Sequence, residues 1–390
     1  MAFRPSNFKC LRYLTVNFYN GDMHIYYYTA YENESDNDKA ALITALQKIG
    51  YRIEKDDETK GYLLAVNDKV RANEVQAVEF VTKKNLPAVK SKHSKKHITP
   101  NDRLAKIIFG EDKKVNLEDL INPELIPIKT TKTDKFYVCA NISFRDLPEN
   151  MQSKLADRFT RAVCDTMTSL ILAGNEYITP QQIAFAMNGY TGKRAATDSF
   201  LEQIKESVEI LRNTNCKIDA SKEAQARGYN FEQTTFDGYL IPADGLEVVY
   251  MNGQKVKAYR VFREPILYLY ARQKKQVLTV DIDMLALPDK INMTRENIIL
   301  QRYLLERIEG MKNEKNNLGC IILYETIFEI LGAQELSKVE KKRIRQRVKI
   351  FLDNWVDLAY IKGYEEEKDG GLIRAIRITL FEDEPKKLKG

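Results

Sequence analysis

The sequence predicts an α+β fold in which groups of helices are followed by β-hairpins. Near the C-terminus, helical patterns at 295–313 and 320–331 precede a basic helix that begins near Lys338, and two short strands come after it. The middle of the chain carries the same order of elements. At about 100 to 200 residues per domain, a chain of 390 residues has room for two to four domains, each with its own core.

The basic helix is predicted by an apolar stripe and by its start signal. Its apolar residues follow the i, i+4, i+7, i+8, i+11 spacing of one helix face: Ile344, Val348, Phe351, Leu352 and Trp355. Ser337, with Glu340 three residues later, forms the pattern of a reciprocal helix cap. Seven of the residues from 338 to 349 are Lys or Arg and one is Glu, so acidic partners for helical ion pairs are missing. This face is either an ordinary solvated surface or one that binds phosphate.

The segment after the basic helix favours DNA. Asp369-Gly370-Gly371 predicts a hairpin turn between strands at 360–364 and 372–380. Two helices, a basic helix and a hairpin, in that order, are the elements of a winged helix-turn-helix, which places its last helix in the major groove, roughly 12 Å wide. We therefore expect DNA to be bound by the outward side chains of the helix and by its wing: Lys338, Lys342, Arg343, Arg345, Gln346, Lys349, Lys362, Arg374 and Arg377.

The middle of the chain predicts another winged helix-turn-helix. A long helix at about 147–173 precedes "YITPQQIAFAMNGYTG", in which Thr179 and Pro180 mark a helix start. A helix in "TDSFLEQIKESVEILRNT" follows, and Asn252-Gly253 then marks a hairpin. The repeat is one of architecture, without visible sequence identity.

The second of these middle helices has an acidic face opposite its apolar stripe. The face carries Glu202, Glu206 and Glu209, with only Lys205 nearby. Because DNA carries one negative charge per ~1.7 Å, we expect a solvated or partner-binding face here, although one glutamate contact to a cytosine stays open. DNA contacts of this block are expected from basic residues in its turn and hairpin: Lys193, Arg194, Lys255 and Lys257.

The N-terminal region predicts a small α+β module of unknown role. Strand patterns at 10–19, 22–31, 51–55 and 62–66 surround a short helix at 40–49. A lysine-rich stretch without apolar periodicity follows, which is typical of a linker. The sequence thus divides into an N-terminal module (1–82), a basic linker and irregular segment (83–135), a first winged-helix domain (136–285) and a second one that is the main DNA reader (286–382).

No catalytic residue, metal ligand or cofactor is predicted. His93 and His97 have the i,i+4 spacing of helical metal ligands, but the lysines around them would repel a metal ion. Asp281 and Asp283 would lie on one side of a strand, a spacing used for divalent metals, yet no third acid is evident. "GYTGKR" from Gly189 lacks the spacing of a phosphate-binding loop. A primase-like or nicking enzyme that uses the two aspartates is the enzyme alternative.

Composition predicts a cytoplasmic protein. The net charge of +6 is concentrated in particular segments, which favours nucleic acid over an anionic membrane as the partner. No run approaches the ~18 to 20 apolar residues of a membrane span, and the first residues lack a signal peptide's apolar stretch. The five cysteines share no CxxC spacing, which favours buried thiols over a zinc site or disulfides.

Three segments resemble a known family: "EPILYLYARQKKQVLTVDIDML", "TRENIILQRYLLERIEGMKN" and "RIRQRVKIFLDNWVDLAYIKGYEE". They resemble theta-type plasmid and phage replication initiators over roughly residues 136 to 380. The resemblance implies two tandem winged-helix domains, of which the C-terminal one reads repeated origin sites and the N-terminal one supports a homodimer or weaker contacts. It also implies the host replicative helicase or its loader as a partner. The expected function is initiation of plasmid, phage or mobile-element replication on double-stranded origin DNA, and the alternative is a winged-helix transcriptional regulator without initiator activity.

Overall fold

The structure is a computed structural model of the chain. It describes residues 92–112, 114–130, 137–191, 196–250, 255–312 and 320–381, with Gln47 and five strands before residue 92. The chain separates into two compact units. The first unit contains Met1–Lys92, Asn175–Thr179 and Ala243–Phe262, and the second contains His93–Gly174, Pro180–Pro242 and Arg263–Gly390.

The first unit consists of two small sheets. One sheet has the order β1-β2-β4-β3, from strands β1 (Thr15–Tyr19), β2 (Met23–Tyr27), β3 (Arg52–Asp57) and β4 (Tyr62–Val66). The other has the order β5-β12-β13-β9, from β5 (Val78–Val81), β9 (Tyr177–Ile178), β12 (Ala243–Tyr250) and β13 (Lys255–Val261). The antiparallel pairing of β12 with β13 confirms the two strands expected around Asn252-Gly253, whose turn lies outside the described residues. The helix expected at 40–49 also lies outside them, apart from Gln47.

The second unit begins with short elements in a region for which the sequence predicts irregular structure. These are β6 (Lys96–Pro100), α2 (Arg103–Ile108), the 3-10 helix η2 (Leu117–Leu120) and β7 (Ile126–Lys129). Strand β6 pairs antiparallel with β14 (Val277–Asp281), with Lys96 opposite Asp281. A strand that forms by pairing across so much sequence leaves little local signal, so its own residues do not reveal it.

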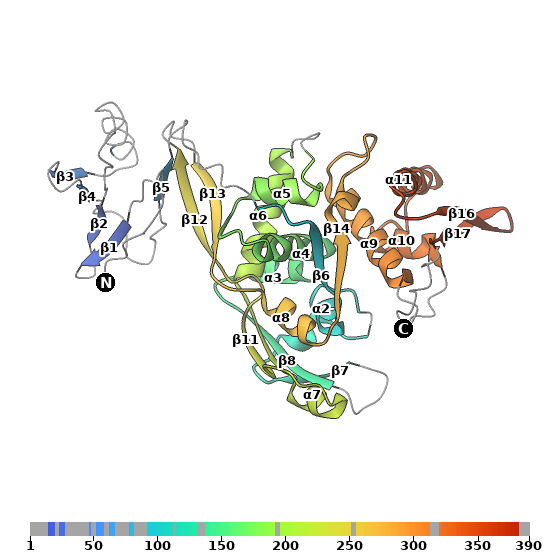
Figure 1. Cartoon of the computed structure of the whole chain (residues 1–390), viewed down its shortest axis with the longest axis horizontal. Helices are drawn as coiled ribbons and strands as arrows, with labels where there is room; N and C mark the ends of the chain where they lie inside the picture. The colour runs from blue at the N-terminus through green and yellow to red at the C-terminus, as the bar shows by residue number, and fades with distance from the viewer. Residues whose placement is uncertain are drawn as a thin grey trace, which may run out of the picture. The chain divides into compact units, whose positions relative to one another are not determined.

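An antiparallel sheet with the order β11-β10-β8-β7 forms one part of the second unit (Figure 1). Its other strands are β8 (Tyr137–Phe144), β10 (Thr214–Asp219) and β11 (Thr235–Tyr239). Helices α7 (Ser221–Arg227) and α8 (Ile266–Gln273) belong to the same region. Alternate residues of the strands are buried, among them Val138, Ile218 and Phe236, so one face of the sheet joins the core.

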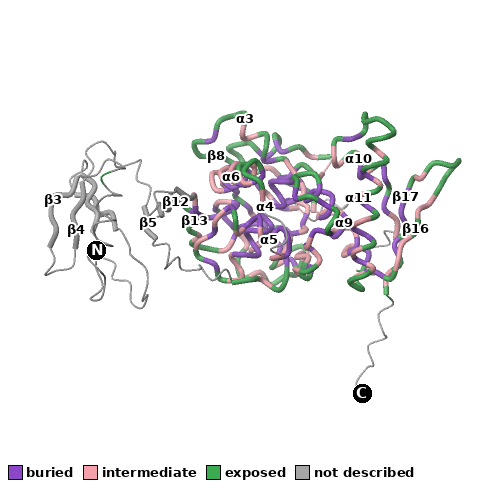
Figure 2. Tube along the Cα trace, turned by 90° about the horizontal axis from the view of Figure 1, so that it is seen from above, coloured by how far each residue is buried: buried purple, intermediate pink, exposed green. Residues whose placement is uncertain are grey.

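The helices of the middle block surround α4. They are α3 (Glu149–Gln152), the 3-10 helix η3 (Ser153–Leu155), α4 (Arg158–Leu172), α5 (Pro180–Met187) and α6 (Asp198–Arg212). Every residue of α4 from Phe159 to Leu170 is buried, and Figure 2 shows this helix in purple. The single helix expected at 147–173 is interrupted, because Asp157 has an extended backbone and accepts the Phe159 and Thr160 N–H groups as the cap of α4.

The C-terminal block contains α9 (Arg295–Lys312), β15 (Ile321–Leu323), α10 (Tyr324–Ile330), α11 (Lys338–Asp357), β16 (Gly363–Asp369) and β17 (Leu372–Thr379). Asp369 pairs with Leu372, so Gly370 and Gly371 alone form the turn, with φ of 57° and 83°. Positive φ at both turn residues suits glycine and the twist of the flanking strands. The first strand was expected at 360–364 and instead begins at Gly363 and ends at Asp369, because pairing with β17 overrides the low strand propensity of its three glutamates.

The middle and C-terminal blocks share one chain order. Each has a helix, a short strand, two more helices and then an antiparallel pair of strands. In each sheet the short strand pairs with the second strand of the pair: β9 with β13, and β15 with β17. The middle block differs by an insertion, β10-α7-β11, between its last helix and its strand pair. The protein is thus a mixed helix-and-strand structure with several small sheets.

The expectations about membrane-spanning segments and about the cysteines can be compared with the structure. Within the described ranges, no helix is long and apolar enough to cross a lipid bilayer. Cys164 and Cys216 are buried thiols, whereas Cys139 and Cys320 are half-buried and Cys10 lies outside the described residues. None of the four described cysteines is in a disulfide.

Candidate nucleic-acid interface

Helix α11 is fixed to the core by the apolar stripe that the sequence predicts. Ile344, Val348, Phe351, Leu352 and Trp355 are each at most 2% exposed. Trp355 also donates its indole N–H to the carbonyl of Met284, at 3.2 Å. The expected cap is confirmed, since Ser337 Oγ accepts the Glu340 N–H while Glu340 accepts the Ser337 N–H. These contacts determine which side chains of α11 face away from the core.

Five outward side chains of α11 are exposed: Lys338, Lys342, Arg343, Gln346 and Lys349. Among the residues that the structure describes, none of the five is in a side-chain hydrogen bond or an ion pair with the protein. The acid within this segment, Glu340, is engaged in the helix cap, and its hydrogen bonds with Ser337 lower its pKa. The four exposed cations of this face, Lys338, Lys342, Arg343 and Lys349, therefore present positive charge that forms no ion pair with a described carboxylate.

The other three cations of the segment are held by the protein. Arg347 Nη1 contacts Glu296 at 3.0 Å and Asn297 at 2.9 Å, both at the start of α9. Lys341 lies over the Phe328 ring, with its Nζ 5.6 Å from the ring centroid. Arg345 is half-buried, and the sequence gives no sign of the partners that hold it.

Arg345 connects α11 to α10 and to the hairpin. Its Nη1 donates to the carbonyl of Ile373 at 3.4 Å, and its guanidinium lies 5.8 Å from the centroid of the Tyr324 ring. Tyr324 in turn donates its hydroxyl to Glu366 in β16, at 3.0 Å. To contact a base, Arg345 would have to release at least part of these contacts.

The arginines of the hairpin have acidic partners within the hairpin. Arg374 pairs with Asp369 at 3.0 Å, and Arg377 donates its Nε–H to Glu367 at 2.7 Å. Lys362 is exposed just before β16. Exposed ion pairs of this kind are typically worth about 0 to 1 kcal/mol, so phosphate could replace the carboxylates at little cost.

The acidic face of α6 is partly neutralised. Lys205 pairs with Glu202 at 2.6 Å, Arg212 with Glu209 at 2.8 Å, and Lys154 in η3 with Glu206. Lys154 was not evident as a partner from the helix alone, since it is far from α6 in the sequence.

The basic residues expected to bind DNA in the middle block are only partly described. Lys193 and Arg194 lie outside the described residues, as does the side chain of Lys255 in β13. Lys257, also in β13, is half-buried, with its Nζ 5.8 Å from the centroid of the Tyr259 ring. The described geometry therefore assigns the clearest cationic surface to α11.

Comparisons with known proteins give only weak likenesses. No protein-family model matches the chain, and no curated protein is significantly similar to it. A crystal structure of a selenomethionine derivative of domains 2 and 3 of RctB has 9% identity and a TM-score of 0.31, over 72% of this chain and 98% of that one. A second structure of RctB domains 2–3 has 8% identity and a TM-score of 0.31, over 66% and 91%. These scores do not establish a common fold, so the case for DNA binding rests on α11 and its surroundings.

The candidate catalytic residues lie apart from α11 in sequence and in different local settings. Strand β14 ends at Asp281, which pairs with Lys96 at 2.6 Å, while Asp283 lies in the 3-10 helix η4 (Ile282–Leu285). The expectation that both aspartates share one side of a strand is therefore wrong. His93 stacks on Tyr190 at 4.1 Å between ring centroids, and His97 is buried in β6, so the two do not share a helix. Across the described ranges, no group of three or more His, Cys, Asp or Glu could hold a metal ion.

Proposed function

We propose that this protein binds double-stranded DNA in a sequence-specific manner, with α11 in the major groove and the β16–β17 hairpin as a wing. The single observation that carries the proposal is the exposed, unpaired face of α11. A duplex carries one negative charge per ~1.7 Å, so such a face is attracted to DNA and releases condensed counterions when it binds. The order α9, β15, α10, α11, β16, β17 supports a winged helix-turn-helix at this end of the chain.

Contacts along α11 should differ in kind. Lys338 and Lys349 lie near the ends of the basic face, and we assign them to phosphates, which position the protein. Gln346 lies in the middle of the face and is exposed, so we assign it to an adenine. Arg345 is the candidate for a guanine, at the expense of its contacts with Ile373 and Tyr324.

The biological role we propose is initiation of replication at the origin repeats of a plasmid, phage or other mobile element. The repeated chain order of the middle and C-terminal blocks supports two winged-helix domains that read one extended site. The middle block would make the weaker contacts, because the face of α6 carries three glutamates. Origin opening would come from binding energy and DNA deformation, without catalytic activity of the protein itself. The host helicase or its loader, and a second copy of the chain, would be its partners.

Salt-dependent binding tests the DNA-binding proposal. Replacing Lys342 and Lys349 together with alanine should weaken binding and reduce the slope of log K against log salt by about two, because two phosphate contacts are lost. The matched control replaces Lys114 and Lys217, two exposed lysines far from α11 in the sequence, and should leave the slope unchanged. Equal slopes for both double variants in folded protein would show that α11 is ordinary solvated surface.

A replication assay separates an initiator from a regulator. A plasmid that carries the coding region and its flanking repeats should be maintained with the wild-type chain and lost with the Lys342→Ala/Lys349→Ala variant. A transcriptional regulator would bind the same repeats in vitro without maintaining the plasmid.

A further inference from the structure

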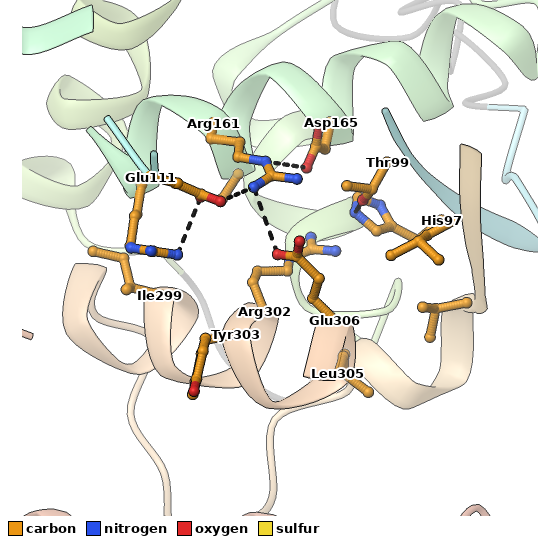
Figure 3. A pocket seen from close by; sticks show the side chains of 14 residues that line it. His97, Thr99, Glu111, Arg161, Asp165, Ile299, Arg302, Tyr303, Leu305 and Glu306 are labelled. Atoms are coloured by element: carbon orange, nitrogen blue, oxygen red, sulfur yellow. Dashed lines mark hydrogen bonds and ion pairs between the residues drawn. The ribbon is translucent and has the colours of Figure 1, made fainter. Parts of the chain in front are cut away.

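A small cavity lies inside the second unit, between α4, α9 and the strand pair β6–β14 (Figure 3). Its volume is about 40 Å³, enough for a small ion or a few waters but not for a nucleotide. Part of the wall is apolar: Ala162, Leu278, Val280, Ile299 and Leu305. The rest of the wall is ionisable or polar, and it includes three arginines.

Two of the three carboxylates at the cavity are already matched by cations. Glu111 accepts from Arg158 at 3.1 Å and also from Arg161. Glu306 contacts Arg161 at 3.5 Å and Lys106 at 3.6 Å. These interactions join α2, α4 and α9, and Figure 3 shows Arg161 at their centre.

Arg302, on α9, is the cation of the cavity without a matching carboxylate. Its Nη2 donates to Thr166 Oγ1 at 3.2 Å. Its Nε and Nη1 are buried and meet no acceptor among the described residues. Burial lowers the pKa of the guanidinium to about 10, although the charge of Asp165 opposes this shift. Buried N–H donors nearly always have partners in folded proteins, so these two point to a ligand.

Asp165 supplies only part of the missing negative charge at neutral pH. Its carboxylate lies 3.8 Å from Arg161, but burial raises its pKa to about 7, so it is partly protonated there. His97 remains a neutral ring, because burial and the charges of Arg302 and Arg161 lower its pKa. Its two ring nitrogens already lie 3.3 Å from Ser169 Oγ and from Thr99 Oγ1. As Asp165 takes up its proton, the cavity is left with surplus positive charge at Arg302.

We propose that this cavity binds a small inorganic anion, held by the Nε and Nη1 of Arg302 at the junction of α4 and α9. Figure 3 shows Arg302 rising from α9 toward α4, with its guanidinium between the side chains of Glu306 and His97. The apolar wall excludes water and strengthens the attraction between the anion and the guanidinium. The anion is independent of DNA, since the cavity is built from residues outside α11.

The test compares thermal unfolding of the full chain in sodium chloride, sodium phosphate and sodium gluconate at one fixed sodium concentration. Gluconate is too large for the cavity and serves as the reference. A ligand that binds only the folded chain raises Tm in a saturable way, and we expect a rise of roughly 2 °C or more for chloride or for phosphate. A rise of Tm in chloride identifies the anion as a halide, and a rise in phosphate identifies it as an oxyanion.

Arg302→Met should abolish this rise, while Arg295→Met, which removes another arginine of α9 outside the cavity, should retain it. If the salts give equal Tm in the wild type, or if Arg302→Met keeps the full rise, the proposal is wrong. Crystals of the wild type soaked in bromide provide a measurement that does not depend on the folding of a variant. If chloride is the salt that raises Tm, an anomalous peak within hydrogen-bonding reach of Arg302 Nε and Nη1 is expected, and bromide found only elsewhere would then overturn the site.

Discussion

At the level of single residues, the cations of α11 differ in what already holds them. Lys349 is exposed and unpaired among the described residues, whereas Arg347 is held by Glu296 and Asn297. The sequence already places Lys349, but not Arg347, among the outward side chains of α11. The partners of Arg347 come from α9, so only the folded chain shows what holds it.

Lys349→Ala should weaken binding to all DNA sequences alike and reduce the salt slope by about one, because a phosphate contact carries no base information. Arg347→Ala is the matched control and should leave the slope unchanged. Binding titrations at several salt concentrations measure both. A change of sequence preference in Lys349→Ala would instead place this lysine at a base edge.

Arg345→Ala should cost about 1 to 3 kcal/mol in binding and relax the preference at one base pair, if Arg345 contacts a guanine. If its role is confined to holding the wing against α11, the loss will be the same for every DNA sequence. Competition binding against single-base variants of the site distinguishes the two results, and urea unfolding of the variant measures the contribution of its contacts with Ile373 and Tyr324 to stability.

Asp165→Asn should change how stability depends on pH. Burial raises the folded pKa of Asp165 from 3.8 to about 7, so the folded chain binds the proton more tightly than the unfolded chain. Its contribution to stability is therefore complete below about pH 4 and is lost as pH rises to about 7. The asparagine variant does not titrate, so its free energy of unfolding should rise relative to wild type across this range and then level off. Urea unfolding of both proteins from pH 4.5 to 8 measures the difference, and a constant difference would contradict the assignment.

At the level of elements, local sequence signals predicted some features and missed others for identifiable reasons. The stripe and cap of α11 and the glycines after Asp369 act within a few residues, and the structure confirms the helix and the turn. Strand β6 depends on pairing with β14, and the acidic strand β16 depends on pairing with β17, so both escape a local pattern.

At the candidate site, too, the sequence predicts local features but not contacts with distant parts of the chain. The sequence identifies the cations of α11 but not the partners that hold Arg345 and Arg347. The charged cavity was not foreseen at all, because Glu111, Arg161 and Arg302 lie far apart in the sequence.

The face of α6 leads to a prediction at this scale. Replacing Glu202 and Glu206 with glutamine should preserve or slightly tighten DNA binding, because two negative charges are removed and their partners Lys205 and Lys154 are released. Affinity is measured at low salt, where such charges are least screened. A large loss confined to one base position would show that α6 reads sequence.

At the level of the whole molecule, a buried charge network joins the two blocks with the shared chain order. Arg161 of α4 and Glu306 of α9 are in contact, and Arg302 of α9 donates to Thr166 of α4. Separating buried charges from their partners is costly, commonly about 3 to 5 kcal/mol when one member is removed. We therefore expect the first helices of both blocks to keep one fixed relation, so that DNA sites read by the protein should tolerate little change in internal spacing. Binding to sites with one or two inserted base pairs tests this, and unchanged affinity would indicate that the two blocks bind DNA independently of each other.

Two carbonyls of η4 restrict how the C-terminal block, which we propose to bind DNA, can be prepared in isolation. Met284 accepts the indole N–H of Trp355, and Leu285 accepts the side-chain N–H of Gln301 at 3.0 Å. A clone that starts at residue 286, the predicted domain boundary, would strand both donors in the core, at about 1 to 3 kcal/mol each. A fragment that starts at Ile282 keeps both carbonyls. We therefore expect the fragment from Ile282 to be folded and the fragment from residue 286 to be recovered as inclusion bodies.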